Sequence, residues 1–504
     1  MAGSVQAFNK QYFSVNQPSI FESYNARLLR YTVNEAFYEN TAYSDIHSLF
    51  AGYKVQEGLY KYIRPIYNPA HQVIRFYQSV IWPGILDKAA GDAGAIPLTV
   101  GEGADDDKLR AAIAQVWVNS NWKDNKGVHV LRGSNLGDSI LYIRDDLHRG
   151  DVSIEVLHPS SVKEIEMDKR GFVRSYKIEE KRFTEDGKTS YVYTETCEHG
   201  EGENIEYRTY KNNAPFAENT DNDGNSRSSW SEPYGFIPMV KVSHELSGLD
   251  WGLSAIHNEI PKFAQLDSLA SHFYDEIHKE IDNPGLIAGA SKPTARLAFE
   301  TEDATTDNPQ PGREQKNLLW IKDPSAHFQT MVGSIDVSAV TNEIQKLLEK
   351  IESDLPELNR DVWNAERKDG VKAARDMIAN KVVSVRARYD NSVVYANQMS
   401  IAIGGMRGYE GFDGYNLDSY KSGALDHSVS ERPVFTPDPT IEAENEMKIW
   451  TTAAAVARDS GGSIPVETVL LALGKTAEQI QDLGSQRLAA IKMMQEDTIP
   501  NDKP

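Results

Sequence analysis

The sequence contains a single cysteine, Cys197, among 504 residues. One thiol cannot form an intrachain disulfide, and small secreted domains usually depend on several disulfides for their stability. The scarcity of cysteine therefore excludes the disulfide-stapled secreted class and is typical of a protein that works in a reducing compartment. A chain of this length has room for roughly two to four domains, each with its own hydrophobic core.

Long apolar runs are also missing. No window of the sequence approaches the roughly 18 uninterrupted apolar residues that a transmembrane helix requires. Residues 1–11 have neither the basic stretch nor the apolar stretch of a secretory signal. We therefore expect a soluble protein of the cytoplasm that has no contact with membranes.

The sequence has fewer basic than acidic residues. The chain has 53 Lys and Arg residues against 74 Asp and Glu residues, which gives a formal net charge of −21. Proteins that coat nucleic acid or bind anionic membranes need clustered Lys and Arg side chains, so the composition argues against both classes. It is compatible with a protein past which DNA slides without sticking.

The usual catalytic motifs are absent. The sequence has no Walker lysine loop, no G-x-G-x-x-G after a predicted strand, no H-E-x-x-H and no G-x-S-x-G. Residues 219–224 imitate the start of an EF-hand calcium loop, but the twelfth position is Trp230, where a calcium site needs glutamate. We therefore expect no catalytic, cofactor-binding or metal site; an enzyme whose site follows none of these motifs is kept as an alternative.

What the sequence does contain is a set of long helical patterns. Apolar residues recur at helical spacing over Leu253–Ile281, where Ser254 is the expected N-cap, over Ile335–Leu355 and over Val371–Ile403. At about 1.5 Å per residue, the first and last of these helices would be roughly 40 and 50 Å long. Each has only one expected helical partner in its own chain, so we expect the remaining apolar surface to be buried against other copies in a ring.

Before this stalk, the apolar pattern changes to a period of two residues. Residues 19–82 are expected to be mainly helical, and Lys108–Trp117 is a further short helix. Strands then form a mixed α+β body, with hairpin turns at Asp168–Gly171 and Thr184–Gly187 and a polar loop over residues 212–233. The predicted strands are Val128–Leu131, Ser139–Ile143, Val152–Val156, Val173–Ile178, Thr189–Thr194 and Glu206–Tyr210.

A charged segment, Asn359–Gly370, separates the second and third long helices. Charge alone does not distinguish an exposed connector from a loop that projects into a pore and contacts phosphates. The large aromatic side chain of Trp363 favours contact with a partner. The candidate pore residues are Arg360, Trp363, Asn364, Arg367 and Lys368.

Taken in order, these segments resemble the portal, or head–tail connector, proteins of tailed bacteriophages. The likeness covers most of residues 20–495, and the order of the motifs carries it. The motifs are Tyr67-Asn68-Pro69 before an amphipathic helix; Gly235–Val240 leading through Gly252–Ser254 into the first long helix; Leu347–Ile351, Leu355–Leu358 and Asp369–Ala373 around the charged segment; and Ser463–Thr468 with Leu473–Lys475 near the C-terminus.

The resemblance implies a portal-like α+β architecture. It consists of a helical stalk with one long helix, a mixed α/β wing, a small α/β clip insert and a helical C-terminal crown. The implied divisions are a wing over residues 1–252, stem helices over 253–282 and 335–354, a clip over 283–334, a tunnel loop over 355–370, a long helix and wing return over 371–440, and a crown over 441–504.

The resemblance also implies a function. Portal proteins form a ring, a dodecamer, at one capsid vertex, through which double-stranded DNA passes non-specifically during packaging and ejection, and they have no catalytic site. The implied partners are the terminase large subunit, head-completion or neck proteins, tail proteins, and the major capsid and scaffolding proteins. The implied location is the virion, with the host cytoplasm during assembly. A non-portal structural ring or adaptor of the phage neck or tail is the alternative.

The resemblance implies roles for two sets of acidic residues. Acids on the first stalk helix, repeated around a ring, would form a channel wall that repels phosphate, while acids of the clip would dock a basic partner such as the terminase. The strand-like runs Leu286–Ala288 and Leu318–Ile321 are expected to pair between neighbouring subunits. The channel-wall residues are Asp267, Asp275, Glu276 and Glu280, and the docking residues are Glu300, Glu302 and Asp303.

Replacing Arg360, Arg367 and Lys368 together with serine should leave ring assembly intact, because an exposed loop contributes little to a core. DNA packaging or retention should fall severalfold, because three charges that contact phosphate are lost. A packaging assay measures this effect, with assembly checked by light scattering. Intact rings that package DNA like the wild type would show that the segment is only a connector.

Overall fold

The computed structural model divides the chain into two units, Met1–Ser430 and Glu431–Pro504. Its described part contains both helices and sheets, so the fold class is mixed α and β. The described residues are 23–43, 67–82, 96–184, 187–217, 219–220, 225–248, 250–281, 285–288, 318–321, 325, 337–358, 369–432 and 434 and, in the second unit, short helical pieces within 447–470.

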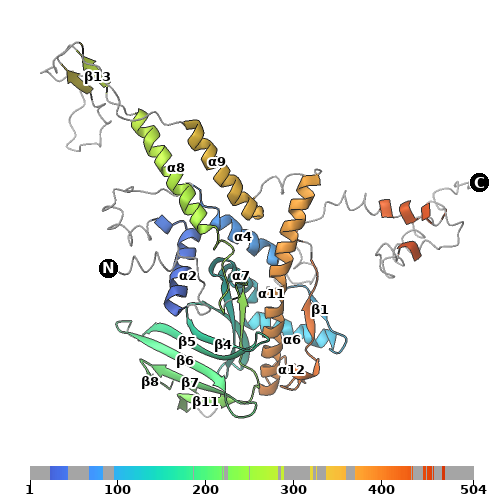
Figure 1. Cartoon of the computed structure of the whole chain (residues 1–504). Coiled ribbons are helices and arrows are strands. Elements are labelled where there is room, and N and C mark those ends of the chain that lie inside the picture. The colour runs from blue at the N-terminus through green and yellow to red at the C-terminus, as the bar shows by residue number, and fades with distance from the viewer. Residues whose placement is uncertain are drawn as a thin grey trace, which may run out of the picture. The chain divides into compact units, whose positions relative to one another are not determined.

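Two antiparallel sheets form most of the β structure of the first unit (Figure 1). The smaller sheet has the order β12 (Met239–Ser243), β2 (Asp138–Asp146) and β3 (Asp151–Leu157). The larger has six strands: β11 (Ser229–Glu232), β7 (Ile205–Lys211), β6 (Ser190–His199), β5 (Val173–Phe183) and β4 (Val162–Met167) in this order, with β8 (Ala214–Pro215) beside β7. Two short pairs join β1 (Leu98–Val100) to β15 (His427–Val429) and β9 (Asn219–Thr220) to β10 (Ser226–Arg227).

Most of the predicted strands are confirmed. The period-two runs after residue 138 fall on β2, β3, β5, β6 and β7, and Gly171 and Gly187 adopt positive φ angles of 89° and 68° in the two predicted turns. Glycine suits this left-handed region because it has no Cβ. Strand β4 was not predicted, because three of its six residues are charged and only Val162, Ile165 and Met167 are apolar.

Two predictions for this body were wrong. Residues 128–131 lie in helix α7 (Trp122–Leu136), where buried His129, Val130, Gly133 and Ser134 follow the helical period. A short apolar run does not by itself distinguish a strand from a buried helical segment. Residues 212–233 are not a simple polar loop either, because they contain β11, which pairs with the preceding strand β7.

The three long helices are present with shifted starts. They are α8 (Ile260–Ile281), α9 (Val337–Asp354) and α11 (Asp369–Arg407). Ser254 is not an N-cap; α8 begins six residues later, with Pro261 in its first turn, where the missing N–H leaves no helical bond unmade. The Ser254 hydroxyl instead donates to the carbonyl of Ser134 at 2.9 Å.

Helices α8 and α9 pack side by side, with β13 (Gly285–Ala288) beyond the end of α8 (Figure 1). Strand β13 pairs in parallel with β14 (Leu318–Ile321) of the same chain. Pairing of the two runs between neighbouring subunits stays a prediction, because each strand of a two-stranded pair keeps one open edge. A parallel pair needs a long crossover connection, which residues 289–317 are long enough to provide.

Helix α11 is much more enclosed than the sequence suggested. It packs against β2, β3 and β12, against β15, and against α4 (Ala70–Ile81) and α6 (Asp106–Asn119). Its apolar stripe, which includes Val382, Val385 and Tyr389, is buried within the subunit. The prediction that this helix has one partner was wrong, whereas Met377 and Val383 do remain exposed, at 53% and 56%.

The carboxylate of Asp138 is a fully buried connection point between these elements. It accepts hydrogen bonds from the backbone N–H of Gly252 at 2.9 Å, from Tyr31 Oη at 3.1 Å and from Ser243 Oγ at 3.1 Å. Lys241 Nζ lies 3.3 Å away as its ion-pair partner, and both side chains are almost completely buried. Asp138 thereby joins β2, β12, helix α2 (Tyr24–Tyr38) and the segment that leads to α8.

Lys241→Met should destabilise the subunit by about 3–5 kcal/mol, because the Asp138 carboxylate would remain buried without its cation. Lys421→Met is the matched control: Lys421 pairs with Glu203, but both side chains are mostly exposed, so the expected loss is below about 1 kcal/mol. Urea unfolding measures both. Equal losses in the two variants would contradict the role given to the buried pair.

Candidate functional site

The structure describes only part of the predicted site. The pore residues Arg360, Trp363, Asn364, Arg367 and Lys368 and the docking residues Glu300, Glu302 and Asp303 lie outside the described residues. Among the predicted channel-wall acids, Asp275, Glu276 and Glu280 belong to α8, but their side chains are not described. Only Asp267 has a described side chain.

Asp267 is not a channel-wall residue. Its carboxylate is fully buried and accepts hydrogen bonds from Tyr43 Oη at 2.6 Å and from the backbone N–H of Tyr67 at 2.8 Å. Burial, followed by the hydrogen bond to Asp267, raises the pKa of Tyr43, so its phenol stays a donor. The prediction for this residue was wrong because an acid on an amphipathic helix can face donors of its own chain, and those donors cannot be seen in the helical pattern.

The base of the predicted tunnel loop is firmly packed. After α9, the 3-10 turn η2 (Pro356–Leu358) places Glu357 in the core, with its side chain 1% exposed. Glu357 accepts hydrogen bonds from Tyr77 Oη of α4 at 3.0 Å and from Lys381 Nζ of α11 at 2.7 Å. Lys262 of α8 forms ion pairs with Glu259 and with Asp354 at the end of α9. The segment 359–368 therefore starts and ends on elements that are tied to one another.

Two buried histidines lie behind this base. His244 Nδ1 is 3.1 Å from Tyr389 Oη, and its ring lies edge-to-face on Tyr77 at 4.6 Å. His129 lies between Ser139 Oγ at 2.6 Å and Ser392 Oγ at 3.1 Å. Burial lowers the pKa of each histidine to about 3, so both are neutral at physiological pH. Sequence analysis gave neither a role, because their partners are up to 263 residues away along the chain.

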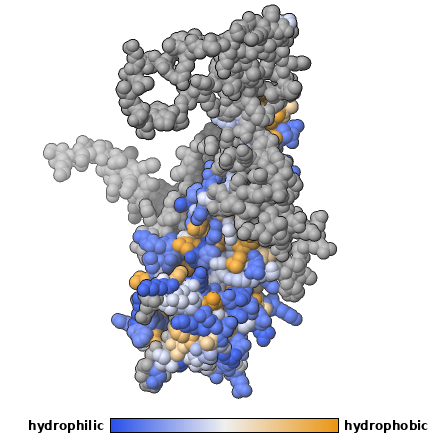
Figure 2. Space-filling model, turned by 90° about the vertical axis from the view of Figure 1, so that its left-hand side faces the viewer, coloured by the Kyte–Doolittle hydropathy of each residue, from blue (hydrophilic) through white to orange (hydrophobic). Residues whose placement is uncertain are grey.

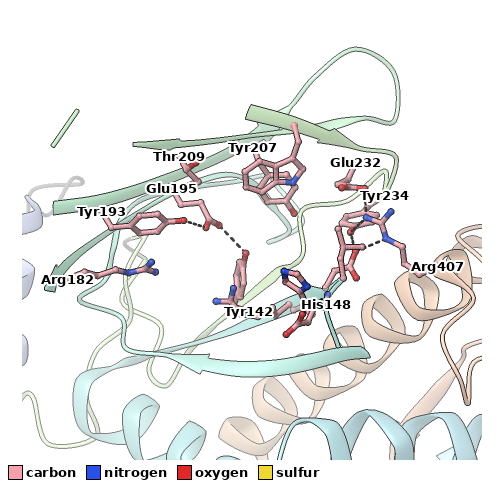
Figure 3. A pocket seen from close by; sticks show the side chains of 16 residues that line it. Tyr142, His148, Arg182, Tyr193, Glu195, Tyr207, Thr209, Glu232, Tyr234 and Arg407 are labelled. Atoms are coloured by element: carbon pink, nitrogen blue, oxygen red, sulfur yellow. Dashed lines mark hydrogen bonds and ion pairs between the residues drawn. The ribbon is translucent and has the colours of Figure 1, made fainter. Parts of the chain in front are cut away.

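A cavity of about 290 Å³ lies between the two sheets, lined by residues of β2 and the turn after it, of β6, β7 and β11, and by Arg407 (Figure 3). We refer to it as the intersheet cavity. On one side, Glu195 accepts hydrogen bonds from three tyrosine hydroxyl groups: Tyr142 at 3.0 Å, Tyr176 at 2.8 Å and Tyr193 at 2.9 Å. Figure 3 shows Tyr142 and Tyr193 directed at this carboxylate.

A second cluster closes the other side of the intersheet cavity. Asp145 accepts from Arg407 Nε, Tyr234 Oη and Tyr409 Oη, each at 2.7 Å, and Arg407 also donates to Glu232 at 2.6 Å. Burial raises the pKa of Glu232, while Arg407 opposes this shift. The cluster joins the C-terminal end of α11 to β2 and β11, which makes it a structural junction.

Several polar groups that line the cavity are held by hydrogen bonds and ion pairs. The hydroxyl groups of Tyr142 and Tyr234 donate to carboxylates, and burial raises the pKa of both, so neither is a nucleophile or base at neutral pH. Arg407 is held by Asp145 and Glu232. Among the described residues, no group of three His, Cys, Asp or Glu side chains could hold a metal ion.

Comparison with known proteins adds no family assignment: no protein-family model and no curated protein matches the chain. In the part of the chain that the structure describes, no helix combines the length and the apolar character needed to span a bilayer. The geometry and the sequence pattern therefore carry the functional argument.

His129 and His244 should make the subunit acid-labile. An unfolded histidine has a pKa of about 6.5, whereas these folded histidines have a pKa of about 3. Between these values only the unfolded chain binds the protons, so stability falls as pH falls, by about 1.4 kcal/mol per pH unit for each histidine.

His244→Gln should therefore reduce the dependence of unfolding free energy on pH by up to about 1.4 kcal/mol per unit between about pH 5.5 and 4. His199→Gln, made at an exposed histidine, is the control for the substitution itself. Urea unfolding at several pH values gives the slopes. Equal slopes in His244→Gln and the wild type would contradict a neutral buried histidine.

Proposed function

We propose that this chain is the subunit of a phage portal, a ring through which double-stranded DNA is packaged into and ejected from a capsid. The observation that carries this proposal is the succession of α8, an insert containing β13 and β14, α9, the buried turn η2, a charged segment and then α11. The 39 residues of α11 make a helix of about 58 Å. A helix–insert–helix stalk followed by a loop and one long helix is what a portal requires and an adaptor lacks.

The stalk supports assembly into a ring. Among the described elements, α9 makes its main packing contacts with α8 and η2, and its one buried side chain is Ile351. Leu347 and Leu348 are half-buried, and Val337 is 46% exposed, so an apolar strip of α9 lacks full cover within the subunit. On the face of the molecule in Figure 2, the coloured hydrophobic residues form small separate patches among hydrophilic ones. A second copy is the simplest cover for the strip on α9.

The charge balance supports passage of DNA. An excess of acid, with a net charge of −21, disfavours adhesion of a polyanion. Arg360, Arg367 and Lys368 then supply cations for transient contacts with phosphate, in a segment that also carries Asp361, Glu366 and Asp369 and whose two ends are anchored by η2 and α11. In this proposal the clip, residues 283–334, docks the terminase and later the neck proteins, and hydrolysis of ATP belongs to the terminase.

The second candidate is a structural ring or adaptor of the phage neck or tail. The intersheet cavity does not separate the two candidates, because both are assembly proteins without catalysis. What separates them is the presence of a continuous central channel and the effect of the loop on DNA packaging.

Electron microscopy of the purified chain should show rings of about twelve copies with a central channel. Leu347→Asp should shift most of the protein from rings to smaller species in light scattering, because it charges the partly covered strip of α9. Val118→Asp is the control, since Val118 is 74% exposed on α6 and should tolerate the same charge. Val385 is unsuitable for this test, because it is 3% exposed and belongs to the core of the subunit.

A chain that stays monomeric at high concentration, or forms rings without a channel, would contradict the portal proposal. Rings that survive Leu347→Asp would instead show that the stalk is not the assembly surface.

A further inference from the structure

The edge strands of the two sheets differ in whether side chains form hydrogen bonds with their main-chain groups. On β3, the backbone N–H of Ile154 donates to Ser120 Oγ at 2.8 Å, and on β4 the carbonyl of Val162 accepts from Arg27 Nη2 at 2.5 Å. On these two edge strands, side chains thus form hydrogen bonds with main-chain groups that another strand could otherwise use. Natural proteins commonly cover or block sheet edges, because an open edge can pair with another chain. On β12, the other edge strand of the smaller sheet, no side chain of the described residues makes such a bond to the main chain.

The register of β12 shows which of its main-chain groups face outward. Ile143 donates to the carbonyl of Pro238, and His244 donates to the carbonyl of Gly137, so these two pairs occupy hydrogen-bonded positions of the β2–β12 ladder. Bonded and non-bonded pairs alternate in an antiparallel ladder. Val240 and Val242 therefore bond to β2, while the N–H groups of Lys241 and Ser243 point away from it. Within the described residues, neither N–H has a hydrogen-bond partner.

Burial confirms that the exposed part of β12 is its backbone. The side chain of Lys241 is 2% exposed, because it pairs with Asp138, yet the residue as a whole is only half-buried. The surface that Lys241 presents therefore belongs to its main chain. This is the geometry to which an extended segment adds as a further strand.

A groove of about 350 Å³ lies along this edge, between β12, the turn joining β4 to β5, and α11. All five residues of β12 line it, although neighbouring side chains point to opposite faces, which places the groove along the edge of the strand. Its other apolar residues include Phe172, Leu246 and Met399, and Leu246 is 72% exposed.

The charge of the groove is opposite to that of the chain. Its lining contains Arg170, Lys241 and Arg388 but no Asp or Glu, although acids outnumber Lys and Arg by 74 to 53 in the sequence. Lys241 is paired with Asp138. Arg388 donates to the main-chain carbonyl of His244, which is a neutral acceptor, so Arg170 and Arg388 both keep a positive charge that can meet a carboxylate of an incoming segment. An acidic chain is the complementary partner, and the most abundant acidic chain in a ring is the neighbouring copy.

We propose that the edge of β12 binds an extended, acid-bearing segment of a second copy of this chain, which continues the three-stranded sheet as a fourth strand. The main chain of that segment bonds to Lys241 and Ser243, its apolar side chains enter the groove, and a carboxylate meets Arg170 or Arg388. The identity of the occupant rests on the proposed ring, whereas the open edge does not.

Hydrogen exchange of individual amides tests this. In dissociated subunits, the amides of Lys241 and Ser243 should exchange rapidly; in the assembled protein they should exchange at least tenfold more slowly. The amides of Val240 and Val242 bond to β2 in both states and serve as internal references.

Arg170→Glu should weaken assembly at least tenfold and remove the protection of Lys241 and Ser243. Lys169→Glu is the matched control: it lies next to Arg170 in the same turn, is exposed and does not line the groove, so assembly should be unchanged. Leu246→Asp, at the exposed rim of the groove, is a second variant that should act like Arg170→Glu.

The outcomes separate this inference from the portal proposal. Rings in which Lys241 and Ser243 exchange as fast as in free subunits would overturn the edge pairing and leave the portal proposal standing. Protection in small oligomers that never close into rings would support the edge pairing and overturn the portal. Protection that requires an added neck or terminase protein would overturn the second copy as occupant, and a chain that never self-associates would overturn both.

Discussion

The buried pair of Asp138 and Lys241 is the constraint on which much of the first unit depends. Removing a carboxylate and an ammonium group from water is costly unless further hydrogen bonds satisfy them, and Asp138 has three such donors besides Lys241. These donors come from α2, from β12 and from the segment before α8, so one charge fixes the relation of three elements. The same pair draws the Lys241 side chain inward, which leaves the main chain of β12 as the outward surface of that strand.

Helix α11 is the second element that organises the first unit, because its side chains contact three separate regions along its length. Near its N-terminal end, Lys381 binds the buried Glu357 at the base of the charged segment. In its middle, Tyr389 contacts His129 and His244. At its C-terminal end, Arg407 closes the intersheet cavity through Asp145 and Glu232. The segment before α11 is therefore attached to a helix that is itself fixed along its length, which suits the role of a tunnel loop in the proposed portal.

Periodicity in the sequence predicted the elements whose patterns are local. The long helices and five of the strands follow from apolar spacing, and the two tight turns follow from their glycines. The predictions that were wrong share a physical cause: each of these features depends on partners far away in the sequence. Whether residues 128–131 form a helix or a strand was decided by what packs on them, and the burial of Asp267 was decided by Tyr43 and Tyr67, about 200 residues earlier. Likewise, Arg407 meets Asp145 across 262 residues, and no spacing rule indicates such a pair.

Burial also changes what the acidic composition means for function. Of the 74 acidic residues, Asp138, Glu195, Asp267 and Glu357 are buried and held by donors of their own chain, so they contribute to cohesion rather than to a repulsive surface. Screening limits the reach of exposed charges to roughly 8 Å at physiological salt. In the proposed ring, repulsion of DNA along α8 therefore depends on the acids after Asp267, at positions 275, 276 and 280. In that proposed ring, the orientation of those three side chains toward the channel would add to the effect of the net charge on how freely DNA slides.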